Sequence, residues 1–137
     1  MKALTLSDFP EQLAAPASVN GEEAAWEKKD CLTAIEWLLQ TGNAILGIEL
    51  WLIGEDGIRT AVCTKSGPVI YVSSCDPLKG ETWTDYVQRS GREAAGLITA
   101  FRWPADSLEP PMPVHFNLTW ANLEWFRSHE RECRKYF

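Results

Sequence analysis

The amino-acid sequence predicts an α+β fold: an antiparallel sheet of about four strands with an N-terminal helix, a central helix and a C-terminal helix. Two stretches, 20–40 and 82–103, carry apolar residues at helical spacing. Between them, residues 44–74 hold runs of β-branched and aromatic residues separated by turn residues. The links between these runs are too short for helical crossovers, so neighbouring strands are expected to be antiparallel.

We expect one domain over residues 1–137, because this length suits a single hydrophobic core and no linker or repeat divides it. Residues 1–19, with Pro10 and Pro16, are expected to form an irregular leader. No stretch is apolar and long enough for a signal peptide or a membrane span, so we expect a cytoplasmic protein.

The first helix is predicted from Asn20 to about Gln40. Asn20 is a good N-cap residue, and Glu22 and Glu23 would place negative charge at the positive end of the helix dipole. Gly42 follows the last apolar position and suits a C-cap. The face expected to be buried carries apolar residues at helical spacing: Cys31, Leu32, Ile35, Leu38 and Leu39.

The opposite side of this helix is expected to carry Trp26 and Trp37 beside the acids Asp30 and Glu36. Tryptophans set among charges on an exposed surface are typical anchors of protein interfaces. An equally supported interpretation is that another segment, such as the N-terminal leader, covers this side as well. The sequence does not choose between the two.

Three strands are expected next, at Ala44–Ile53, Ile58–Thr64 and Val69–Ser74, and their short links favour an antiparallel meander. Glu49 lies in the middle of the first strand. Because side chains two positions apart share a face of a strand, a solvent-facing Glu49 would place Trp51 at the surface too.

A central helix is predicted to start with Thr82 as its cap and to end at Trp103-Pro104. Its expected buried face is Trp83, Tyr86, Val87, Ser90, Ala94, Leu97, Ile98 and Phe101. After a proline-rich connection at 104–113, alternating residues predict a half-buried strand over Val114–Ala121. A terminal helix is expected over Asn122–Phe137.

The charge of the chain is unevenly distributed. The net charge is −6, and residues 1–60 hold ten acids and four bases, whereas residues 61–137 hold nine of each. An acidic protein repels nucleic acid and anionic membranes, so neither is an expected partner. A localised acidic face favours a basic protein partner, although solubility alone also accounts for a modest net charge.

No residue pattern indicates catalysis, so we expect no enzyme and no cofactor. His115 and His129 have no nucleophile beside them, and the Gly54–Gly57 turn carries acids that would repel a phosphate. The four cysteines lack metal-ligand spacing, which favours reduced thiols over a metal site. Nothing near Cys75 is expected to lower the pKa of its thiol.

Two segments carry a resemblance to a known family. Leu32–Gly57 reads LTAIEWLLQTGNAILGIELWLIGEDG, and Trp83–Ser90 reads WTDYVQRS. The pattern is a helix ending in Gly, a strand with ILG and a Trp, a DG turn and a W-x-x-Y-V helix. It resembles small bacterial immunity proteins that accompany polymorphic or contact-dependent toxins. The resemblance implies a cytosolic protein that binds a toxin domain made by the same cell, and many such toxins are basic nucleases.

The acidic and aromatic residues of the first part are the expected contact surface for such a partner. These residues are Glu22, Glu23, Asp30, Glu36, Trp37, Glu49, Trp51, Glu55 and Asp56. They follow from charge and helical position rather than from the resemblance. Two other functions stay open: a self-associating structural or scaffold protein, and a small-molecule-binding domain with its pocket under the central helix. A monomer or a weak dimer is expected.

Overall fold

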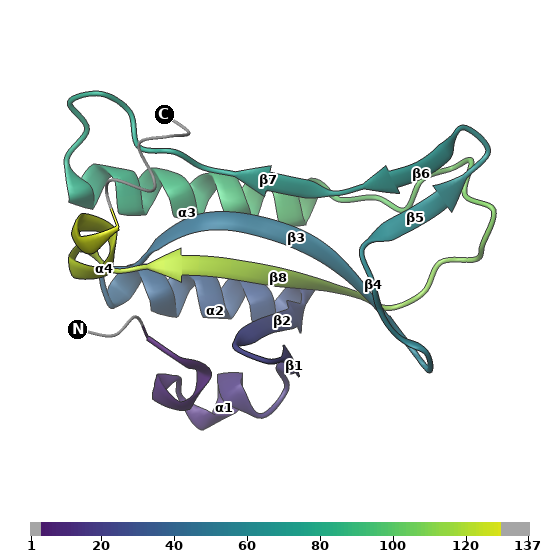
Figure 1. The fold of residues 1–137 in the computed structure, drawn as a ribbon, viewed down its shortest axis with the longest axis horizontal. Coiled ribbons are helices and arrows are strands. Elements are labelled where there is room, and N and C mark those ends of the chain that lie inside the picture. Colours follow the sequence, from purple (N-terminus) through teal and green to yellow (C-terminus); the bar gives the residue numbers. More distant parts are fainter. Residues whose placement is uncertain (1–3, 130–137) are drawn as a thin grey trace.

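The computed structural model describes residues 4–129 and has a curved antiparallel sheet with two long helices on one face (Figure 1). The helical elements are a short 3-10 helix η1 (Leu6–Asp8), α1 (Glu11–Ala14), α2 (Lys28–Gln40), α3 (Trp83–Ala100) and α4 (Leu123–Ser128). The strands are β1 (Ser18–Asn20), β2 (Glu23–Glu27), β3 (Ala44–Gly54), β4 (Gly57–Arg59), β5 (Ala61–Thr64), β6 (Gly67–Ile70), β7 (Val72–Ser74) and β8 (Val114–Ala121). The predicted α+β class and the antiparallel sheet are confirmed.

The centre of the sheet is the antiparallel pair β3–β8, in which Leu50 lies opposite Phe116. The strand order is β1-β2-β8-β3-β4. The strand β7 also pairs with β3, at residues 47–49, whereas β4 pairs with β3 at residues 52–54. A separate two-stranded sheet is formed by β5 and β6. The main sheet is larger than expected, since the N-terminal segment adds β1 and β2. The predicted second strand, 58–64, divides into β4 and β5, so the meander is interrupted.

The predicted start of the first helix at Asn20 is wrong. Asn20 ends β1, Gly21 turns the chain with a φ of 62°, and Glu22 and Glu23 lead into β2. An Asn-Gly pair suits a hairpin as well as an N-cap, and here β2 finds a hydrogen-bonding partner in β8. The helix begins at Lys28 instead and ends, as predicted, at Gln40, before Gly42 with a φ of 80°.

The expected irregular leader contains η1, α1 and β1, and its first two elements cover α2 and the edge of the sheet. The Phe9 ring packs against three indoles, with centroid distances of 5.6 Å to Trp26, 4.5 Å to Trp37 and 5.2 Å to Trp120. The Trp26 Nε1 donates a hydrogen bond to the Leu13 carbonyl at 2.7 Å. Trp26 therefore belongs to the core, as the interpretation of a covered side expects, whereas Trp37 is only half-buried and still lines the surface.

The cap and the burial of α3 follow the prediction closely. The Thr82 hydroxyl accepts a hydrogen bond from the Asp85 amide at 3.1 Å. The Ser90 hydroxyl lies in the core, where it accepts from the Ile45 amide at 2.9 Å and so ties the helix to β3. Two details differ: the helix ends at Ala100 rather than at Trp103-Pro104, and Leu97 is exposed because β7 and β6 leave a groove beside it.

The helices α2 and α3 contact each other closely at Gly91. A Cβ atom added at this position would clash with the side chain of Leu39 on α2. A Cβ atom added at Gly96, in the same helix, would meet no other atom within 4 Å. The two glycines therefore form a matched pair, one packed against a neighbouring helix and one open.

We expect Gly91→Ala and Gly96→Ala to change stability in opposite directions. Gly96→Ala should raise the free energy of unfolding by about 0.5–1 kcal/mol, because alanine loses less backbone entropy in a helix. Gly91→Ala should lower it by about 1–3 kcal/mol, since Leu39 must move out of a packed interface. Urea unfolding of both variants measures these changes, and two changes of the same sign would contradict the close packing.

The predicted strand Val114–Ala121 is confirmed as β8, although it is central rather than half-exposed. Asn117, expected on its polar face, is buried and donates a hydrogen bond to the Ala24 carbonyl at 2.8 Å. The last helix begins as expected after Asn122, whose side chain accepts from the Trp125 amide. The helix ends at Ser128, with His129 as its C-cap, and is shorter than the predicted stretch to Phe137; residues 130–137, with Cys133, lie outside the described residues.

Candidate partner-binding surface

Asp30, Glu36 and Trp37 line one hollow of about 400 Å³ between α1 and α2, the acidic hollow. The remaining lining residues are Pro10, Gln12, Leu13, Thr33 and Gln40. Thus the structure brings together, in a concave site, three of the residues expected to contact a partner. Two carboxylates, two amides and a hydroxyl around an indole form a polar, acidic site with one aromatic wall.

The geometry of this acidic hollow follows from helical spacing in α2. Positions 30, 33, 37 and 40 recur every three or four residues and so share one face of the helix. The indole of Trp37 is half-buried and is held against the Phe9 ring. Neither Asp30 nor Glu36 forms an ion pair with another residue in the range 4–129, so the charge of both stays available to a partner.

Glu22 and Glu23 lie at the β1–β2 turn and line a second hollow, of about 790 Å³. Its other side chains include Val19, Trp120 and the stacked pair of Trp125 and His129. Residues 4–7 border this second hollow, and Pro10, Gln12 and Leu13 border the acidic hollow. The N-terminal segment therefore separates two neighbouring sites that hold four of the predicted acids.

Glu49 and Trp51 share a face of β3, as the alternation predicts, but Trp51 is not at the surface. Its side chain is 2% exposed, and its Nε1 donates a hydrogen bond to Glu49 Oε1 at 3.1 Å. The expectation of an exposed Trp51 is thus corrected: the residue lies in the central β3–β8 pair, opposite His115, and its indole is hydrogen-bonded to Glu49. A buried Trp51 cannot touch a partner directly. Its hydrogen bond instead orients the carboxylate of Glu49, which is half-buried.

Glu55 and Asp56 are exposed at the tip of the β3–β4 hairpin. The hairpin projects at the lower right of the molecule, away from α1 (Figure 1). The nine predicted residues accordingly fall into separate groups. Those of the two hollows border one N-terminal segment, whereas the hairpin tip is remote from them.

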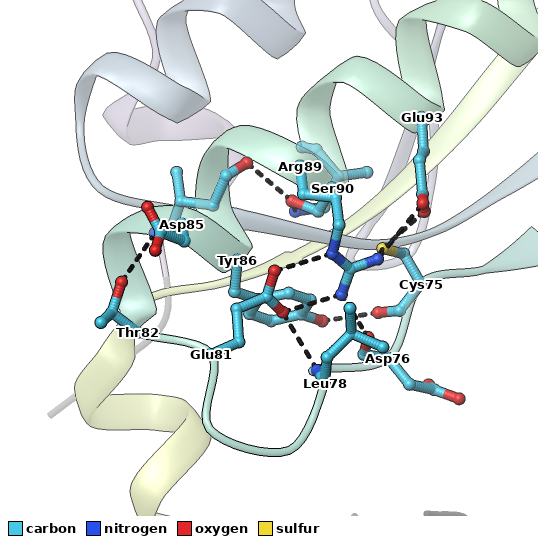
Figure 2. Close-up of polar contacts among 12 residues, drawn as sticks. Cys75, Asp76, Leu78, Glu81, Thr82, Asp85, Tyr86, Arg89, Ser90 and Glu93 are labelled. Carbon is cyan, nitrogen blue, oxygen red and sulfur yellow. Dashed lines mark hydrogen bonds and ion pairs between the residues drawn. The ribbon is translucent and has the colours of Figure 1, made fainter.

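A polar cluster that was not predicted from the sequence joins the loop after β7 to α3 (Figure 2). Arg89 donates from Nε to Glu81 Oε2 at 2.7 Å and from Nη2 to the Asp76 carbonyl at 2.6 Å. Its Nη1 also donates to Glu93 Oε1 at 3.2 Å, and the hydrogen bonds from Arg89 to Glu81 hold the pKa of Glu81 down to about 2. The sequence signal for this cluster is Glu93, which lies four residues after Arg89 in the helix, a spacing that favours an ion pair.

The thiol of Cys75 is part of this cluster, and its surroundings raise its pKa. Burial raises its pKa to about 11, and a hydrogen bond of 2.9 Å from its Sγ to Glu93 Oε2 adds to the shift. The positive charge of Arg89 lowers the pKa of Cys75, but by less than burial and Glu93 raise it. The prediction that nothing near Cys75 lowers the pKa of its thiol is wrong for Arg89, although the net shift of the pKa is upward.

Alkylation by iodoacetamide at pH 8.5 should therefore be slow at Cys75 and faster at the exposed Cys63. Glu93→Gln removes a group that raises the pKa of Cys75, so this variant should be alkylated faster at Cys75. Peptide mass spectrometry reports each cysteine separately. Equal rates at Cys75 in the wild type and in Glu93→Gln would contradict the role of the carboxylate.

Residues 4–129 contain no group of three or more His, Cys, Asp or Glu side chains that could hold a metal ion. None of their helices has both the length and the apolar character needed to cross a membrane. No curated protein and no solved structure matches the chain.

A family model described as Immunity protein 40 matches residues 16–109, about 70% of the chain. The match extends from β1 to the proline-rich connection and includes α2, β3 and α3, the elements that carry the resemblance seen in the sequence. It also includes the α2 wall of the acidic hollow. The chain belongs to the Immunity protein 40 family.

Proposed function

We propose that this protein neutralises a toxin domain made by the same cell, in the cytosol, by binding it directly and without catalysis. Membership of an immunity protein family is the observation that carries the proposal. The partner is a basic, nuclease-like toxin domain encoded beside this chain.

The acidic hollow is the proposed centre of the contact. A basic side chain of the toxin would meet the carboxylates of Asp30 and Glu36, which have no counter-ion among the described residues. The face of Trp37 offers such a cation a further favourable contact. Since Phe9 already fixes this indole, little side-chain entropy remains to be lost on binding.

The other acids of the proposed surface lie outside this hollow. Glu22 and Glu23 at the β1–β2 turn lie across the N-terminal segment from it, and Glu49 lies on β3 beside Trp51. The hairpin acids Glu55 and Asp56 would act at longer range, by attracting a basic partner before contact. Long-range attraction speeds association, whereas the desolvated centre slows release.

Isothermal titration of the purified chain with the neighbouring toxin domain tests this proposal. We expect saturable binding whose affinity falls at least about tenfold between low salt and about 0.5 M salt, because opposite charges are screened. An absence of binding at low salt would end the proposal. Binding that does not respond to salt would leave an immunity function but remove the acidic surface from it.

A further inference from the structure

The outer edge of β6 and β7 has no strand beside it. β7 pairs with β3 and β6 pairs with β5, each on one side, within the described part of the chain. The Tyr71 carbonyl accepts from the Leu50 amide and the Cys75 amide donates to the Leu46 carbonyl, both at 2.9 Å. Because both backbone groups of a residue in an antiparallel strand point to one side, those of Ile70, Val72 and Ser74 point outward.

This edge is also apolar. Ile70 is 59% exposed, Val72 is 65% exposed, and Leu97 of α3 is 51% exposed. They border a groove of about 370 Å³ between α3 and the β6–β7 edge, which includes Phe101. Residues 69–74 contain no charged residue, and only Pro68, next to them, protects the edge. An unprotected apolar edge is a template for another strand.

We propose that a second copy of this chain pairs with this edge, antiparallel and centred on Val72. In this register Val72 meets its symmetry mate, and Ile70 of each copy lies opposite Ser74 of the other. All outward backbone groups of these residues then have partners. The ladder stops beyond them, because Pro68 has no N–H and would lie opposite Asp76, whose carbonyl already accepts from Arg89.

The charges near the edge suit a second copy. Arg102 lines the groove near Ile70, and its guanidinium donates to the backbone carbonyls of Thr99 and Phe101 rather than to a carboxylate. Asp76 is exposed, and its carboxylate makes no ion pair within residues 4–129. In the antiparallel register, Asp76 of one copy lies opposite Pro68 of the other, at the end of the edge near Ile70 and Arg102. The two opposite charges, one from each copy, are thereby brought to the same end of the edge. Residues 69–74 themselves carry no charge, so the paired strands of the two copies do not repel each other.

The proposed dimer edge lies apart from the acidic hollow, the proposed centre of toxin binding, although Val72 lies opposite Glu49 in the β3–β7 pair. The contact is short, so we expect a weak dimer with a dissociation constant of about 10–100 µM.

Sedimentation equilibrium of the full chain from about 5 µM to about 1 mM tests the proposal. The wild type should shift from monomer to dimer across this range. Val72→Lys should raise the dissociation constant at least about tenfold, because two ammonium groups would meet at the symmetry axis. Val19→Lys, at a valine of β1 that is 54% exposed and remote from the edge, is the matched control and should dimerise like the wild type.

A charge exchange tests the register. Asp76→Arg and Arg102→Asp should each weaken the dimer, and the double variant should restore it. Circular dichroism of each variant verifies that it is folded. A wild type that stays monomeric at about 1 mM, or equal dimerisation of Val72→Lys and Val19→Lys, would overturn the proposal. A double variant that stays as weak as the singles would overturn the register.

Discussion

Trp26→Ala is expected to lower the free energy of unfolding by about 3–5 kcal/mol, more than either glycine substitution in α3. The indole is fully buried in β2 and packs against Phe9. Its truncation leaves a cavity under the N-terminal segment and also leaves the Leu13 carbonyl without its donor. Urea unfolding followed by far-UV circular dichroism measures the change.

Trp26→Phe separates the two causes. Phenylalanine keeps an aromatic ring against Phe9 but cannot donate a hydrogen bond, so the expected loss is smaller, about 1–3 kcal/mol. Trp37→Ala, at a half-buried position on α2, should also cost less than Trp26→Ala. If Trp26→Ala cost no more than Trp37→Ala, the assignment of Trp26 to the core would be wrong.

Reversing the charge of the acidic hollow is expected to have the largest effect on toxin binding. In Asp30→Lys/Glu36→Lys two carboxylates that face a basic partner become ammonium groups. We expect the association rate to fall about 10–100-fold at low salt, because attraction becomes repulsion. The dissociation rate should rise as well, since the pairing at the centre of the contact is lost. Surface plasmon resonance with the immobilised toxin domain separates the two rates.

The matched control reverses the same number of charges at the hairpin tip. Glu55→Lys/Asp56→Lys should slow association only a few-fold and leave the dissociation rate almost unchanged, because a remote charge acts before contact. Near-equal effects of the two double variants on dissociation would mean that the hollow is not the centre of the interface. A larger effect at the hairpin would place the centre there.

Much of the fold could be predicted from local signals. The Thr82 cap, the Gly42 stop and the alternation of β8 each depend on residues close in sequence. The segment after Asn20 could not be predicted in this way, because its partner β8 lies far away along the chain. An Asn-Gly pair followed by acids suits both a helix start and a hairpin, and tertiary pairing decided between them.

The candidate surface was predicted only where its residues share one element. Asp30, Glu36 and Trp37 lie in α2, so helical spacing placed them together. Trp26 was assigned to the same helix and so to the wrong surroundings. The burial of Trp51 depends on how the rest of the chain covers β3, which no local pattern encodes. The contribution of α1 to the hollow was missed for the same reason.

The function proposed for this protein is protection of a cell from a toxin, which it binds through the acidic hollow. Growth of bacteria that co-express the neighbouring toxin domain with each form of the chain tests it most directly. Wild type and Glu55→Lys/Asp56→Lys are expected to restore growth, whereas Asp30→Lys/Glu36→Lys, present at equal levels and folded, should not. Growth that the wild type fails to restore would contradict the function, and full rescue by Asp30→Lys/Glu36→Lys would contradict the surface.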